Sequence, residues 1–241
     1  MSAAELVPVA LTVLAASVVQ GMTGFAFALV AMGILPVLIG LRDAIVLLMV
    51  LGIAGNLIQL ALLRGGWDRR DLVYLWIGAG VGLPLGVAVQ ARELPGLTRI
   101  LGLVLATYSL WQWTRRPTPR APRHAAGGIA AGALGGLLGG ALGTSGPPIV
   151  IWGQLREWSP DRARATQVAY FATTGAVQLG LYARGDMVAP AVLTAAGGLL
   201  PVLVAGLFVG MWIGRRLDAR RFRQVVLAIL LVLGVRLVIA G

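Results

Sequence analysis

The hydrophobic pattern divides the chain into eight apolar runs separated by short polar segments. A helix needs about 20 apolar residues to span a membrane, and most of the runs have that length. The first and fifth are much longer. With approximate limits, the runs are Leu6–Leu41, Ala44–Leu63, Leu72–Ala91, Leu97–Trp113, Ala125–Leu155, Ala163–Ala183, Val188–Gly214 and Phe222–Ala240.

Both long runs are interrupted in their interior. The first contains Gln-Gly-Met-Thr-Gly-Phe at 20–25, and the fifth contains Gly-Thr-Ser-Gly-Pro-Pro at 143–148. Glycine loosens a helix and proline removes a backbone donor. We therefore predict a discontinuous or re-entrant helix at each place, followed in each half by three transmembrane helices.

The two interruptions belong to an internal repeat of about 120 residues. Four landmarks recur in the same order: Thr23-Gly24 with Ser145-Gly146, Arg64-Gly65 with Arg184-Gly185, Gly82 and Gly86 with Gly206 and Gly210, and Arg99 with Arg223. The repeat predicts two related halves, 1–114 and 125–241. Residues 115–124 form an arginine- and proline-rich linker between them.

The arginines predict the topology. If every run crosses once, the arginines divide almost evenly between the two sides, against the positive-inside rule. If the first and fifth runs each return to the side they entered, four arginines lie on one side of the membrane and fifteen on the other, with Arg236 left out. This arrangement places both termini in the periplasm and the linker in the cytoplasm, and it makes the halves inverted. Two short crossings per long run would give the same count, so the sequence leaves both versions open.

Composition supports a membrane protein and limits its chemistry. Hydrophobic residues make up 58% of the chain and charged residues only 12%, with a mean hydropathy of +0.87. The net charge of +11 comes from arginines between apolar runs, so we expect a lipid bilayer and no nucleic acid as partner. With no cysteine and one histidine, His124, we expect no metal site and no cofactor. The predicted fold is an all-α polytopic membrane protein.

The interruptions are the candidate substrate site. A break leaves backbone N–H groups without helical partners, and with the helix dipole they attract an anion. Ser145 or Thr144 can cap the helix that follows, and the two prolines suit its first turn. The alternative is close helix packing by small residues, which we prefer for Gly132, Gly135, Gly136, Gly139 and Gly140. The candidate residues at the breaks are Thr23, Gly24, Phe25, Thr144, Ser145, Gly146 and Pro147.

Polar residues inside the apolar runs extend this site. Asn56 and Gln59 share a helix face, and so do Thr174 and Gln178 at the matching place in the second half. Their amides and hydroxyls can donate hydrogen bonds to an oxyanion; the alternative is hydrogen bonding between helices. Every carboxylate falls near the end of a run or in a loop, so a proton relay inside a span is not expected. The coupling ion stays open.

The paired motifs at 21–25 and 143–148, set in duplicated halves, resemble the TauE/SafE sulfite exporter family. The resemblance covers essentially the whole chain. It implies a transporter that carries sulfite, sulfoacetate, other organosulfonates or related sulfur anions across the bacterial inner membrane. The inverted repeat favours a secondary transporter that works by alternating access. The resemblance gives neither the anion nor the direction, and a homodimer stays open.

Three other functions compete with this hypothesis. Gly143-Thr144-Ser145-Gly146 matches the Gly-x-Ser-Gly motif of intramembrane serine proteases, but the sole histidine lies upstream of the serine in the linker. A passive anion channel would show the same broken helices. A membrane assembly factor without catalytic activity would show no substrate-dependent flux. We expect a transporter and not an enzyme.

Overall fold

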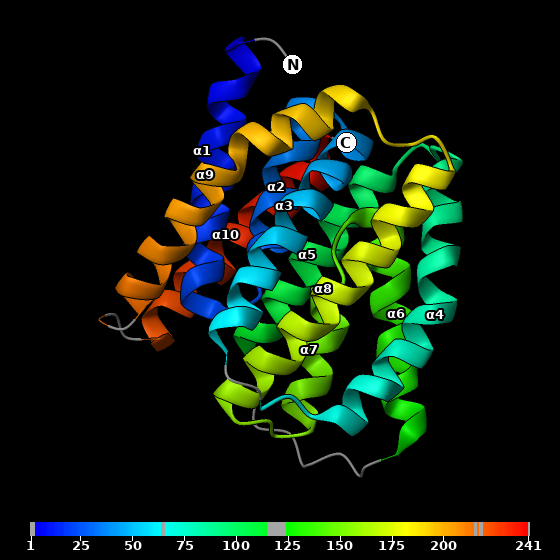
Figure 1. Cartoon of the computed structure of the whole chain (residues 1–241), viewed down its shortest axis with the longest axis vertical. Helices are drawn as coiled ribbons and strands as arrows, with labels where there is room; N and C mark the ends of the chain where they lie inside the picture. Colours follow the sequence, from blue (N-terminus) through cyan, green and yellow to red (C-terminus); the bar gives the residue numbers. More distant parts are fainter. Residues whose placement is uncertain (1–2, 64–65, 115–123, 215, 217–218, 241) are drawn as a thin grey trace.

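The computed structural model describes residues 3–63, 66–114, 124–214, 216 and 219–240, and all regular structure within them is helical. The helices, shown in Figure 1, are α1 (Ala3–Thr23), α2 (Phe27–Ile39), α3 (Leu41–Leu62), α4 (Arg69–Ala91), α5 (Leu97–Thr114), α6 (Ala125–Leu142), α7 (Gly146–Leu155), α8 (Pro160–Arg184), α9 (Pro190–Gly214) and α10 (Ala219–Ala240). The predicted all-α fold is confirmed.

Five of the described helices, α1, α3, α4, α6 and α9, are long and apolar enough to cross a membrane. Large apolar side chains such as Val81 and Ile239 are also exposed on the outside of the bundle, as expected of a surface that meets lipid. The chain is therefore a multi-pass membrane protein.

Both predicted helix breaks are present. The first long run becomes α1 and α2, and the fifth becomes α6 and α7. At 1.5 Å per residue, the 13 residues of α2 and the 10 of α7 extend about 20 Å and 15 Å. Each half-helix is thus shorter than the roughly 30 Å hydrocarbon core and is no complete crossing by itself.

The main contacts between helices recur when each helix is replaced by its equivalent in the other half, where α1 to α5 correspond in order to α6 to α10. α4 packs on α6 as α9 packs on α1, and α3 packs on α9 as α8 packs on α4. The pairs α3 with α8 and α5 with α10 join equivalent helices of the two halves. In Figure 1 the start of α1 and the end of α10 lie toward one end of the molecule, and α6 begins at the other.

Glycines bring the backbones of the main helix pairs into contact. A methyl group at Gly82 of α4 would overlap the carbonyl of Ala133 in α6, and one at Gly132 would overlap the carbonyl of Leu75. Gly21 and Gly210 meet carbonyls across the α1–α9 contact in the same way. The packing prediction is thus confirmed for Gly132, and also for Gly136 and Gly140, which meet the backbone of α4.

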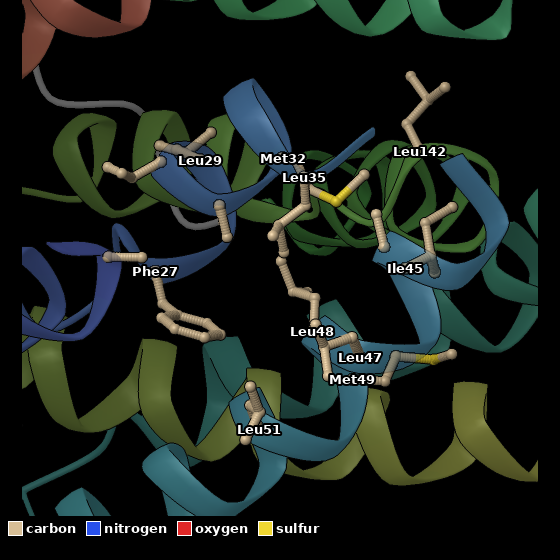
Figure 2. Close-up of a cluster of buried hydrophobic side chains, with 14 of the residues drawn as sticks. Phe27, Leu29, Met32, Leu35, Ile45, Leu47, Leu48, Met49, Leu51 and Leu142 are labelled. Atoms are coloured by element: carbon tan, nitrogen blue, oxygen red, sulfur yellow. The ribbon is translucent and has the colours of Figure 1, made fainter. Parts of the chain in front are cut away.

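An apolar cluster holds α2 in place beside its break. Figure 2 shows Phe27, Leu29, Met32 and Leu35 of α2 beside Ile45, Leu47, Leu48, Met49 and Leu51 of α3, with Leu142 of α6. These four side chains of α2 are at most 3% exposed. The first half-helix is therefore fixed along its length by α3, and its N-terminus has a defined position.

A buried ion pair fastens the end of α7 to the start of α4. Arg156, which follows α7, donates from Nε to Asp71 Oδ2 at 3.1 Å, and Trp158 Nε1 donates to the same oxygen at 3.1 Å. Both charged side chains are at most 3% exposed. The sequence places Asp71 at the end of a run, as observed, but it gives no sign that Arg156, 85 residues later, is its partner.

Candidate anion-binding site

The first break is a tight turn built on Thr23 and Gly24. The Thr23 hydroxyl donates to Val19 O at 2.8 Å and accepts from the N–H groups of Phe25 and Ala26 at 3.4 and 3.3 Å. Gly24 has φ +90°, a conformation that residues with a Cβ rarely adopt. Together they end α1 and start α2, whose first three N–H groups, those of Phe27, Ala28 and Leu29, precede the first intrahelical donors.

The second break is built differently. Gly143, with φ +68°, ends α6 in the left-handed conformation. Ser145 occupies the N-cap of α7 but makes no cap hydrogen bond with its side chain, so the expectation that it caps α7 is wrong. The reason is chemical. An N-cap side chain accepts from the second or third residue of the helix, and here these are Pro147 and Pro148, which carry no N–H.

The serine hydroxyl is consequently available to a ligand. Gly146 is the only one of the first three residues of α7 that carries an N–H, because the next two are prolines. The start of α7 therefore presents one backbone donor and one hydroxyl. The start of α2 presents three backbone donors.

Both half-helices begin at one cavity of about 70 Å³. It lies about halfway along the two central helices, α3 and α8. Its walls come from the first break and α2, from α3, from the second break and from α8. The lining residues are Gln20, Phe25, Phe27, Ala28, Leu48, Met49, Gly52, Ile53, Asn56, Gly143, Ser145, Gly146, Phe171, Thr174, Gly175 and Gln178.

The polar side chains around this central cavity are all neutral. Gln20 Nε2 donates to Asn56 Oδ1 at 3.1 Å, while Gln20 Oε1 is buried without a partner. Gln178 Nε2 donates to Gly139 O at 2.7 Å, and the Thr174 hydroxyl donates to Tyr170 O at 2.7 Å. If both amides of the Gln20–Asn56 pair turn over, the pair keeps its hydrogen bond and Gln20 presents an N–H instead of an oxygen.

These features together suit an anion better than a cation. Two helix N-termini, which carry partial positive charge, lie at one cavity. Rotatable amides and a hydroxyl surround it, and none of its lining residues carries a charge of either sign. An oxyanion would find donors on several sides without meeting a carboxylate.

The structure places six of the predicted site residues on this cavity: Phe25, Asn56, Ser145, Gly146, Thr174 and Gln178. The other five lie elsewhere. Thr23 lines a second cavity, Gln59 lines a third, and Gly24 packs against Arg164. Thr144 and Pro147 are buried and do not line it. A role in binding stays a prediction for each.

Sequence reasoning missed Gln20. Its signal was present, because Gln20 stands one helical turn before Gly24, inside the interrupted motif, and therefore faces the break. The carbonyl of Gln20 also accepts from Gly24 N at 2.6 Å, so the residue takes part in the turn itself. Its side chain bridges the first break to α3.

The geometry also bears on the protease alternative. His124 precedes the first residue of α6, and Ser145 follows its last by three residues. The 18 residues of α6 extend about 27 Å, so the histidine cannot accept the serine proton.

Comparison with known proteins gives the family of the chain. The model of the family "Sulfite exporter TauE/SafE" matches residues 9–237, nearly the whole chain. Neither a curated protein nor a solved structure gives a significant match. The matched region includes both breaks and all the residues that line the central cavity. The chain therefore belongs to the TauE/SafE sulfite exporter family.

Proposed function

We propose that the protein is a secondary transporter of the bacterial inner membrane that moves small sulfur-containing oxyanions, such as sulfite or an organosulfonate. The anion binds in the central cavity, between the starts of α2 and α7. One observation carries the proposal: two half-helices from different halves of the chain begin at the same neutral, hydrogen-bonding cavity.

Named groups would hold the anion there. Backbone N–H groups of Phe27 and Ala28 approach from one half-helix. The Gly146 N–H and the Ser145 hydroxyl approach from the other, and the Gln178 amide lies beside them. Hydrogen bonds to a charged partner contribute about 1.5–3 kcal/mol each, so a few of them offset the loss of hydration.

The size of the cavity favours a small cargo. A buried water needs roughly 10–15 Å³ of such space. A cavity of about 70 Å³ therefore holds several waters or one compact anion. Sulfite, with one sulfur and three oxygens, fits this space as it stands. Sulfoacetate and larger sulfonates require the cavity to widen.

Transport would follow from the exchange symmetry of the helix pairs. If the two halves are inverted in the membrane, as the arginine distribution predicts, an arrangement open to one side has a counterpart open to the other side, in which the two halves exchange conformations. The anion then stays near the midplane while the two halves, or a bundle within each half, move around it. In this proposal the linker at 115–124 lies in the cytoplasm and both termini lie in the periplasm.

The test is flux in proteoliposomes. Purified protein is reconstituted, and uptake of ³⁵S-labelled sulfite is measured with unlabelled sulfite inside the vesicles. We expect saturable uptake and counterflow, which a carrier shows and a channel does not. Linear, non-saturating flux would support the channel. No sulfur anion transported, from a screen of sulfite, thiosulfate, isethionate, taurine and sulfoacetate, would refute the proposal.

A further inference from the structure

Arg164 is held against the first break by contacts from α8. Its Nη2 donates to Met22 O, near the end of α1, at 3.2 Å. Its aliphatic part packs on Gly24, where an added Cβ would lie 2.8 Å from Arg164 Cγ. A guanidinium has five N–H donors, so the bond to Met22 leaves most of them for other partners.

The Arg164 side chain lines two cavities of about 450 Å³ each. The first, which we call the outer cavity, reaches the surface at the exposed residues Pro160 and Asp161. Phe25 lines both the outer cavity and the central one, so this ring is a shared wall between them. A path from the surface to the central cavity thus passes Arg164 first and Phe25 second.

The other cavity beside Arg164 contains an unsatisfied donor. Gln59 is 4% exposed, its Nε2 has no hydrogen-bond partner, and it lines this cavity together with Arg164. The remaining lining residues, Leu62, Leu63, Phe208, Met211 and Trp212, are apolar. A buried N–H without an acceptor is costly, and an anion beside Arg164 would supply the acceptor.

The charge of Arg164 is less neutralised than that of its neighbours. Arg156 pairs with Asp71, and Arg162 pairs with Asp68 at 3.8 Å. Among the described residues, no carboxylate lies within ion-pair distance of Arg164. Asp161, which lines the outer cavity, is exposed to solvent.

We propose that Arg164 is the cation of an outer anion-binding site, where the substrate is captured before it passes Phe25 into the central cavity. Gln59 lines the cavity on the other side of Arg164 and is no donor of this outer site. The planar guanidinium can bind two oxygens of a sulfite or sulfonate group at once. This inference rests on the proposed transport of such anions and adds a residue and a stage to it.

The experiment compares Arg164→Gln with Arg162→Gln in proteoliposomes. Both substitutions remove one positive charge from the same turn of α8, but the Arg162 side chain is 50% exposed and lines neither cavity. At low ionic strength we expect R164Q to raise the KM for sulfite about tenfold with kcat nearly unchanged, and R162Q to change KM less than about twofold. Added salt should shrink the effect of R164Q. Arg164→Lys should restore part of the affinity.

Each outcome decides the matter. Equal KM values for R164Q and R162Q would overturn the outer site while leaving transport intact, and wild-type protein without saturable flux would overturn the proposed function and this inference together. An effect of R164Q on binding of an anionic phospholipid, but not of sulfite, would assign Arg164 to a lipid headgroup instead. If R164Q does not fold, Arg164→Met, which keeps most of the aliphatic packing on Gly24, tests the same site by an expected rise in KM of about tenfold, and an unchanged KM there would overturn it.

Discussion

Ser145→Ala separates a ligand role for this hydroxyl from a structural one. If Ser145 capped α7, its loss would cost about 1 kcal/mol of stability. The two prolines that follow prevent that hydrogen bond, so the substitution should leave stability almost unchanged. It should instead remove one hydrogen bond to a bound anion, which contributes about 1.5–3 kcal/mol. That loss corresponds to a decrease in affinity of about 10- to 150-fold.

The assay measures both quantities on the same preparation. Sulfite affinity is determined by titration calorimetry in detergent, and stability by thermal unfolding without ligand. Ser109→Ala is the matched control, because Ser109 is a buried serine that donates to Leu105 O at 2.7 Å and lines no part of the cavity. It should leave affinity within about twofold of wild type.

Two results would refute this reasoning. A clear fall in unfolding temperature with unchanged affinity would mean that Ser145 stabilises the break and does not bind the anion. Equal losses of affinity in the Ser145 and Ser109 variants would mean that the effect is general. Thr23→Ala provides the converse case, because its hydroxyl does accept from the turn and its loss should lower stability.

Three further predictions concern the scaffold. Asp71→Asn should lower stability by about 3 kcal/mol, because it leaves a buried guanidinium without its carboxylate; thermal unfolding measures this, and an unchanged midpoint would contradict it. Gly82→Val should disrupt the α4–α6 contact and yield little monodisperse protein by gel filtration, whereas Gly80→Val, which meets open space, should behave like wild type. Because the chain has no cysteine, single cysteines at Thr118 and Ala189 can report topology. An impermeant maleimide added to intact spheroplasts should label the second and not the first, and the reverse pattern would overturn the predicted orientation.

The sequence predicted the helices well because the physical signals were local. Hydrophobic runs, arginines at their ends and the two glycine-rich interruptions each occupy adjacent residues. The breaks at Gly24 and Gly143 could be placed almost to the residue, since a turn that needs positive φ selects glycine. The division of each long run into a longer and a shorter helix followed from the same signals.

The candidate site was predicted less completely because it depends on contacts between distant segments. Asn56 and Gln59 share a helix face in sequence terms, yet they line different cavities, since the kind of space beside a helix depends on its neighbours. The partnership of Asp71 with Arg156 and the position of Arg164 at the first break have no local signature. The absent cap of Ser145 is different. It could have been foreseen from Pro147 and Pro148 alone.

The most direct test of the central claim is to locate a bound anion. Selenite has the charge and shape of sulfite and scatters X-rays anomalously at the selenium edge. In crystals soaked with selenite, we predict an anomalous peak in the central cavity, within reach of Ser145 and Gln178, that disappears when excess sulfite competes. No peak there, at a concentration that inhibits sulfite transport, would contradict the account.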